Sequence, residues 1–196
     1  MAYKIYYQKA FEQRCFKLIV EAYQASLNEN IIQLNWDEND ISSELHKHIK
    51  ENPLRTKWGV SSNVEAHIPK NIPKVKGFAN KFPRIDFKLT TFSENNEYEY
   101  FFEAKNLKQN DSALKRRYIN TGINNFTSKK YENGSLIGYL VEGEIEGTVE
   151  GINSLLKKDI RVKELMILKE HNLLKTYYES QHPDIGILKH LLLRFS

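Results

Sequence analysis

The sequence predicts a single α/β domain with a mixed sheet, and three patterns support this prediction. Residues 84–90 and 97–105 alternate in polarity, which is typical of two strands with one buried face. The near-continuous apolar run 134–141 suits a strand buried on both faces, hence a central parallel strand. An amphipathic helix is expected between the segments 97–105 and 134–141, so strand, helix and strand form a right-handed crossover. At 196 residues, we expect one domain spanning 1–196.

Apolar periodicity predicts the other elements. A helix is expected over 8–27, and a second helix from Asn39 or Asp40 onward, because Ile41, Leu45 and Ile49 recur at helical spacing. The further predictions are a strand at 61–68, helices at 149–158 and 173–179, and strands at 165–168 and 185–193.

Composition favours a cytoplasmic protein. Charged residues make up 28% of the chain, and no apolar run approaches the roughly 20 residues of a membrane span, so no membrane partner is expected. The first residues lack the apolar core of a signal peptide. The one cysteine, Cys15, excludes an internal disulfide, and its place in an apolar stripe indicates a core thiol.

Positive charge is concentrated on either side of the two alternating segments. The net charge is only +4, but basic residues outnumber acids strongly at 70–88 and 105–131. Three prolines and two aromatics at 69–83 predict either a flexible insertion or a loop that closes on a phosphate backbone; the loop is favoured because it leads directly into the Asp86 strand. The residues expected to bind nucleic acid are Lys70, Lys74, Lys76, Lys81, Arg84, Lys108, Lys115, Arg116 and Arg117.

The two alternating segments predict a hairpin that gathers charged groups on one patch of sheet. A turn at Asn95-Asn96 places Asp86 opposite Lys105, whereas a turn one residue earlier places Asp86 opposite Glu103. In either register Asp86, Glu103 and Lys105 lie together. Two carboxylates on one patch would repel unless a cation or Lys105 neutralises them, which suggests a metal site.

This arrangement resembles the PD-(D/E)xK nuclease superfamily. The residues that carry the resemblance are Glu44 on the second helix, Asp86, and Glu103 with Lys105, within a stretch from about Asp40 to Glu142. It implies a restriction-endonuclease-like core of order αβββαβ, with an additional N-terminal helix and C-terminal helices and strands. The run 118–126, with Gly138-Tyr139, is similar to bacterial members associated with phage defence.

The sequence departs from the family pattern at two points. Pro83 lies three positions before Asp86 instead of next to the acid. Asp86 and Lys88 also form a competing D-x-K pair, which is disfavoured because Glu65 would have to supply its acid and Glu103 and Lys105 would have no role.

The resemblance implies a metal-dependent nuclease that hydrolyses phosphodiester bonds, most simply in DNA. Mg²⁺, with Mn²⁺ as a substitute, would be held by Asp86, Glu103, the carbonyl of Ala104 and, if it reaches inward, Glu44. Lys105 would position water or stabilise charge on phosphorus. An endonuclease is favoured over an exonuclease, acting in restriction or phage defence, as a homodimer or a subunit of a defence complex. The alternative is a catalytically silent fold that binds DNA or joins a multiprotein complex; the sequence does not distinguish DNA from RNA.

Overall fold

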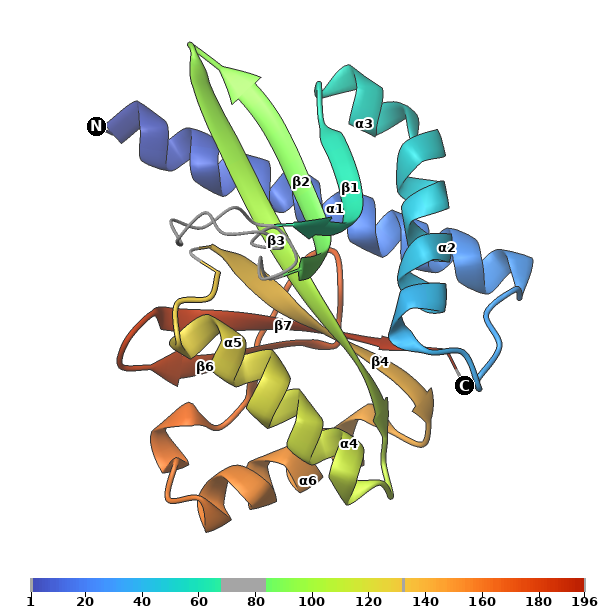
Figure 1. Ribbon diagram of the computed structural model, residues 1–196, viewed down its shortest axis with the longest axis vertical. Coiled ribbons are helices and arrows are strands. Elements are labelled where there is room, and N and C mark those ends of the chain that lie inside the picture. The colour runs from blue at the N-terminus through green and yellow to red at the C-terminus, as the bar shows by residue number, and fades with distance from the viewer. Residues whose placement is uncertain (1, 68–83, 132, 196) are drawn as a thin grey trace, which may run out of the picture.

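The computed structural model describes residues 2–67, 84–131 and 133–195, which form an α/β fold around one mixed sheet of seven strands (Figure 1). The strands are β1 (Ser61–His67), β2 (Arg84–Ser93), β3 (Asn96–Lys108), β4 (Gly134–Glu142), β5 (Ile167–Leu168), β6 (Tyr177–His182) and β7 (Gly186–Arg194). The helices are α1 (Ala2–Glu29), α2 (Glu38–Glu51), α3 (Pro53–Lys57), α4 (Ser112–Arg117), α5 (Asn124–Thr127) and α6 (Ile145–Lys158). Between α4 and α5 lies a π-helical segment, η2 (Tyr118–Ile123), and a 3-10 turn, η3 (Val162–Glu164), precedes β5.

The sheet combines two antiparallel ends with a parallel centre. Its strand order is β1-β2-β3-β4-β7-β6-β5, in which β3, β4 and β7 are mutually parallel. The predicted central parallel strand and its helical crossover are therefore confirmed in β4. The long strand β3 crosses the molecule diagonally, so its first half belongs to the antiparallel part and its second half to the parallel part (Figure 1).

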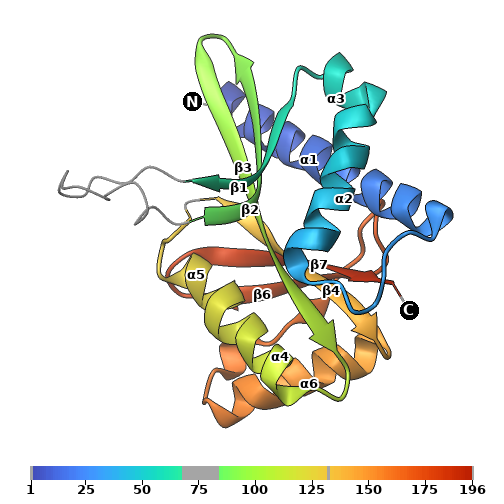
Figure 2. The same cartoon turned by 45° about the vertical axis from the view of Figure 1, so that its right-hand side comes forward.

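Helices cover both faces of the sheet and bury two apolar layers. One layer packs α1 and α2 against the sheet around Phe16, Leu45 and Phe102, and the other packs η2 and α6 around Ile119 and Ile152. Figures 1 and 2 show α1 on the opposite side of the sheet from α4 and α5. Among the described residues, no helix is both long enough and apolar enough to cross a membrane.

The β2–β3 hairpin adopts the second of the two predicted registers. Glu94 and Asn95 form the turn with φ of 49° and 61°, the left-handed conformation that a two-residue type I′ turn requires. Phe87 pairs with Phe102, which places Asp86 opposite Glu103 along the hairpin direction. The pairing between the strands stops at this point, and this break shapes the candidate site described below.

The structure also corrects the predicted elements. The helix predicted at 173–179 is wrong: Tyr177–His182 is strand β6, which pairs with β7 as a hairpin. The amphipathic helix expected before β4 begins after its N-cap Asp111 and contains the π-helical segment η2. Within it Gly122 packs closely on the sheet, because a Cβ there would lie 2.9 Å from the side chain of Leu136 on β4.

Gly134, at the start of β4, gives a direct test of how closely β4 packs against β3. We expect Gly134→Ala to lower the free energy of unfolding by about 1–3 kcal/mol, because the added Cβ would overlap the backbone carbonyl of Phe101, which cannot move aside as a side chain could. Chemical denaturation measures the change. Gly59→Ala is the control, since its φ of 61° is unfavourable for alanine but no atom lies within 4 Å of the added Cβ. An equal loss in both variants would contradict the packing argument.

A carboxylate–lysine cluster where β2 leaves β3

The candidate site forms where β2 separates from β3. Among the described residues, the pairing of these two strands ends at Phe87 and Phe102, and beyond Phe102 β3 pairs only with β4. Two backbone N–H groups on the vacated edge of β3 then donate to carboxylates. The N–H of Ala104 donates to Oδ2 of Asp86 at 2.5 Å, and that of Asn106 to Oε1 of Glu38 at 2.8 Å. Buried backbone donors require partners, so these carboxylates accept the hydrogen bonds that the carbonyl groups of a neighbouring strand would otherwise accept.

Lys105 lies at the centre of the cluster. Its Nζ donates to Oε1 of Glu103 at 2.8 Å and to the carbonyl of Ala104 at 2.6 Å, and it lies 3.9 Å from Oδ2 of Asp86. Lys105 and Glu103 are each only 6% exposed. A lysine so deeply buried needs compensating charge, and the two carboxylates provide it.

The carboxylate of Glu103 is held from several directions. Besides Lys105, Oε1 accepts a 3.3 Å hydrogen bond from Nδ2 of Asn125 on α5. The hydroxyl of Tyr131 lies 2.8 Å from Oε2 of Glu103 and 2.8 Å from the carbonyl of Arg84. Its single proton serves one of these two acceptors at a time. Burial and the charge of Glu103 raise the pKa of the Tyr131 phenol, so it stays protonated and donates.

The folded protein disfavours the ionised form of Asp86. Burial, followed by the negative charge of Glu103, raises the pKa of the Asp86 carboxyl from 3.8 to about 6. Lys105 and the Ala104 N–H act in the opposite direction, and Glu38 adds a further upward contribution. Because burial is the largest of these causes, the shift reports a carboxylate that has lost water, and a cation bound beside it would favour its ionised form.

Glu38 was not among the predicted site residues, because the second helix was expected to begin at Asn39 or Asp40. The helix instead has Asp37 as its N-cap, with the Asp37 side chain accepting from the N–H groups of Asn39 and Asp40. Glu38 therefore falls in the first helical turn, where its buried carboxylate also binds Arg117 at 2.7 Å. Asp37 is as good an N-cap as its neighbours, so the signal was present in the sequence.

Glu44 does not join this cluster, so it is not the third acid that the sequence offered as an alternative to a solvated edge residue. Its Oε1 binds Nζ of Lys47 at 2.9 Å and lies 3.4 Å from Nε2 of His48 on the same helix. Six residues separate Glu44 from Glu38, which turns the two side chains about 120° apart around α2. The competing D-x-K pair does not assemble either, because Lys88 forms its ion pair with Glu99 across the hairpin.

The expected nucleic-acid-binding residues separate into four groups. Lys70, Lys74, Lys76 and Lys81 lie outside the described residues. The prediction for Lys115 is wrong, because this residue is buried and its Nζ donates to the carbonyl of Gln109 at 2.6 Å. Arg84 is exposed, while the cations with acidic partners are Lys108 (Glu142), Arg116 (Asp159) and Arg117 (Glu38).

A cavity of about 660 Å³ opens beside Glu38. Its lining includes Trp36, Asn106, Lys108 and Arg117, but not Asp86, Glu103 or Lys105. The cavity and the cluster meet through Glu38 and Asn106, which are joined by the backbone hydrogen bond on the vacated β3 edge. It therefore offers a polar approach to the cluster from the α2 side, lined by two acids, Asp37 and Glu38, and two cations, Lys108 and Arg117.

Comparison of the chain with protein-family models, with curated proteins and with solved structures finds no match.

Proposed function

We propose that this protein is a metal-dependent phosphodiesterase of the restriction-endonuclease-like class, acting on DNA. The observation that carries the proposal is the convergence of Asp86, Glu103 and Lys105, with Glu38 beside them, where β2 leaves β3. The order α2-β1-β2-β3-α4-β4, antiparallel up to β3 and parallel from β3 to β4, supports the αβββαβ core that the sequence resemblance implies.

The donor set suits Mg²⁺, with Mn²⁺ as a substitute. Asp86, Glu103 and Glu38 offer carboxylate oxygens and Ala104 a carbonyl, which are the hard ligands that Mg²⁺ prefers. Burial and then the charge of Glu103 raise the pKa of Asp86, and a cation bound beside it would oppose both effects. When bound, the ion would neutralise phosphate charge and favour ionisation of the attacking water.

The residues of the chain supply orientation and a fixed positive charge. Lys105 is held by Glu103 and the Ala104 carbonyl, so its ammonium group is already oriented before substrate arrives. Such a preorganised charge stabilises the extra negative charge that develops on phosphorus during hydrolysis. Tyr131 and Asn125 hold Glu103 in place. The reaction proposed is direct attack of water on phosphorus, without a covalent enzyme intermediate.

Cleavage assays test the proposal. The purified protein is incubated with supercoiled plasmid, single-stranded DNA and RNA, with Mg²⁺ or Mn²⁺ and with or without a chelator. We expect metal-dependent nicking or linearisation of the plasmid that the chelator abolishes. Plasmid cleavage indicates an endonuclease, and linear products without nicked intermediates indicate paired sites, as in a homodimer or a defence complex. Hydrolysis of RNA alone would reassign the substrate, and no metal-dependent hydrolysis of any of these would contradict the proposal.

A second candidate function is DNA binding without catalysis. It is favoured by one observation: both oxygens of Glu103 already have protein partners, and Glu103 and Lys105 are nearly inaccessible. A protein of this kind would bind DNA with a strong dependence on salt, because phosphate contacts release counterions. DNA affinity that falls steeply with salt, in the absence of metal-dependent cleavage, would favour this function over hydrolysis.

Glu38 provides a specific test of the cluster. We expect Glu38→Gln to reduce the cleavage rate about 10–100-fold and to raise the Mg²⁺ concentration needed for half-maximal rate, since glutamine keeps an acceptor for the Asn106 N–H but removes the charge. Asp40→Asn in the same helical turn is the control, because Asp40 is exposed. Equal rates in wild type and Glu38→Gln would remove Glu38 from the site.

A further inference from the structure

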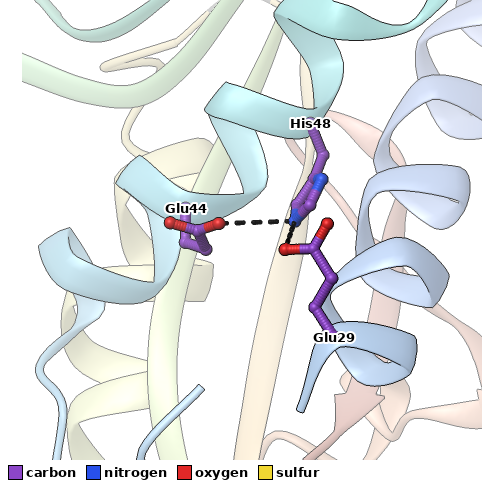
Figure 3. A group of neighbouring side chains, drawn as sticks. All are labelled: Glu29, Glu44 and His48. Carbon is purple, nitrogen blue, oxygen red and sulfur yellow. Dashed lines mark ion pairs between the residues drawn. The ribbon is translucent and has the colours of Figure 1, made fainter. Parts of the chain in front are cut away.

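A second cluster of potential metal ligands lies between α1 and α2, further along α2 than Glu38. Glu29 ends α1, and Glu44 and His48 lie one turn apart on α2 (Figure 3). All three offer an oxygen or nitrogen atom within 4.8 Å of the others. Figure 3 shows the imidazole of His48 directed between the two carboxylates.

The imidazole nitrogen that faces this cluster has no hydrogen bond. The His48 side chain is 6% exposed, and its Nε2 is buried and has no hydrogen-bond partner among the described residues. The nearest carboxylate oxygens, at 3.4 Å on Glu44 and 3.7 Å on Glu29, are at the limit of hydrogen-bonding distance or beyond it. A buried polar atom without a partner carries a free-energy cost, so a ligand that it could bind directly would relieve that cost.

The distances from Nε2 of His48 to the two carboxylates suit neighbouring ligands of one tetrahedral ion. With metal–ligand bonds of about 2.0–2.2 Å, neighbouring ligand atoms of a tetrahedral site lie about 3.3–3.6 Å apart. The distances from Nε2 of His48 to the two carboxylates, 3.4 and 3.7 Å, need almost no adjustment. One imidazole with two carboxylates suits Zn²⁺ and similar transition-metal ions, whereas Mg²⁺ takes oxygen ligands.

Lys47 lies against the same two carboxylates that would bind the ion. Its Nζ lies 2.9 Å from Oε1 of Glu44 and 3.8 Å from Oε2 of Glu29, so it neutralises the same two carboxylates. The Lys47 side chain is 47% exposed and can swing into water when a metal ion replaces it. The ammonium group is therefore a competitor whose removal should strengthen metal binding.

We propose that Glu29, Glu44 and His48 form a Zn²⁺-type transition-metal site that fastens the end of α1 to α2. The site goes beyond the proposed hydrolysis and does not depend on it. It would fix the orientation of α2, which presents Glu38 at its first turn.

Calorimetric titration of the metal-free full-length protein with Zn²⁺ tests the proposal, and Co²⁺ gives a second readout through the strong visible absorption of its tetrahedral complexes. We expect one ion that depends on His48, with affinity reduced more than about 100-fold in His48→Gln, beyond the 10–100-fold effect of losing a residue that only supports a ligand. His46→Gln is the matched control, since His46 is on the same helix but its Nε2 faces the carbonyl of Ser62 at 3.1 Å. The control should bind as wild type does.

If His48→Gln folds poorly, Lys47→Gln provides a second test. Lys47 is on the surface, so its replacement should leave the fold intact. We expect this variant to bind Zn²⁺ more tightly than wild type. Unchanged or weaker binding in Lys47→Gln would overturn the proposal, and so would equal affinity in wild type and a folded His48→Gln. Failure of Zn²⁺ to bind the wild-type protein would show His48 to be only a histidine between two carboxylates. None of these results depends on whether the protein cleaves DNA.

Discussion

Replacing Lys105 with alanine is expected to reduce Mg²⁺-dependent phosphodiester hydrolysis by at least about 10²–10³-fold, the usual effect of removing one preorganised group that stabilises transition-state charge. The ammonium group lies between Glu103 and Asp86 and is shielded from water, so its charge acts at low effective dielectric. Plasmid-nicking rates at saturating Mg²⁺ measure the loss.

Lys105→Ala also leaves two buried carboxylates without their cation, so its folding must be measured alongside its activity. Circular dichroism and thermal unfolding in the presence of Mg²⁺ show whether the variant is native. Lys88→Ala is the matched control, because Lys88 pairs with Glu99 across the hairpin and lies outside the cluster. If a folded Lys105→Ala nicks plasmid as fast as wild type, the assignment of Lys105 is wrong.

The local features of the site were predictable from sequence because they depend on strand alternation. Alternation places Glu103 and Lys105 on one face of β3 whatever the neighbouring chain does. The hairpin register required the turn conformation, and the sequence Glu94-Asn95-Asn96 supports a turn at either of two positions. The structure settles this choice in favour of Glu94-Asn95, and Asp86 approaches Glu103 as a result.

The features that the sequence did not predict depend on tertiary context. Strand β6 carries the sequence Tyr-Tyr-Glu-Ser-Gln-His, which has no strong preference for strand over helix, and its pairing with β7 decides its structure. Similarly, nothing local indicates that β2 pairs with β3 only from Phe87 onward, which leaves the N–H groups of Ala104 and Asn106 to side-chain acceptors. The role of Glu38 depends on where that pairing ends.

Charge counted along the sequence overestimated the free cationic surface for the same reason. Lys115 was expected to meet phosphate, yet it is buried beside α6, with its Nζ on the carbonyl of Gln109. Arg116 and Arg117 lie next to it in the chain but bind Asp159 and Glu38 from different elements. Only the fold determines which basic side chains find acidic partners, so a basic run predicts a nucleic-acid surface weakly.

Asp86→Asn is expected to stabilise the fold above pH 6 while abolishing hydrolysis. The pKa of Asp86 is about 6 in the folded protein against 3.8 ordinarily, so between these values the native state binds more protons than the unfolded state. Stability must therefore fall as pH rises through this window. With about 1.4 kcal/mol per pKa unit, the full cost of ionisation is on the order of 2–3 kcal/mol above pH 6. Asparagine avoids this cost and still accepts from the Ala104 N–H.

Urea unfolding from pH 4 to pH 8 measures this difference. We expect wild type and Asp86→Asn to be equally stable near pH 4 and to diverge as pH rises, with the variant more stable at pH 7.5. Mg²⁺ should narrow the gap by stabilising wild type alone, because the ion binds the folded carboxylate cluster and not the unfolded chain. Glu94→Gln, in the exposed hairpin turn, should show neither effect. Parallel pH profiles for wild type and Asp86→Asn would mean that Asp86 ionises freely, and the cluster would then lack the excess negative charge on which its affinity for a cation depends.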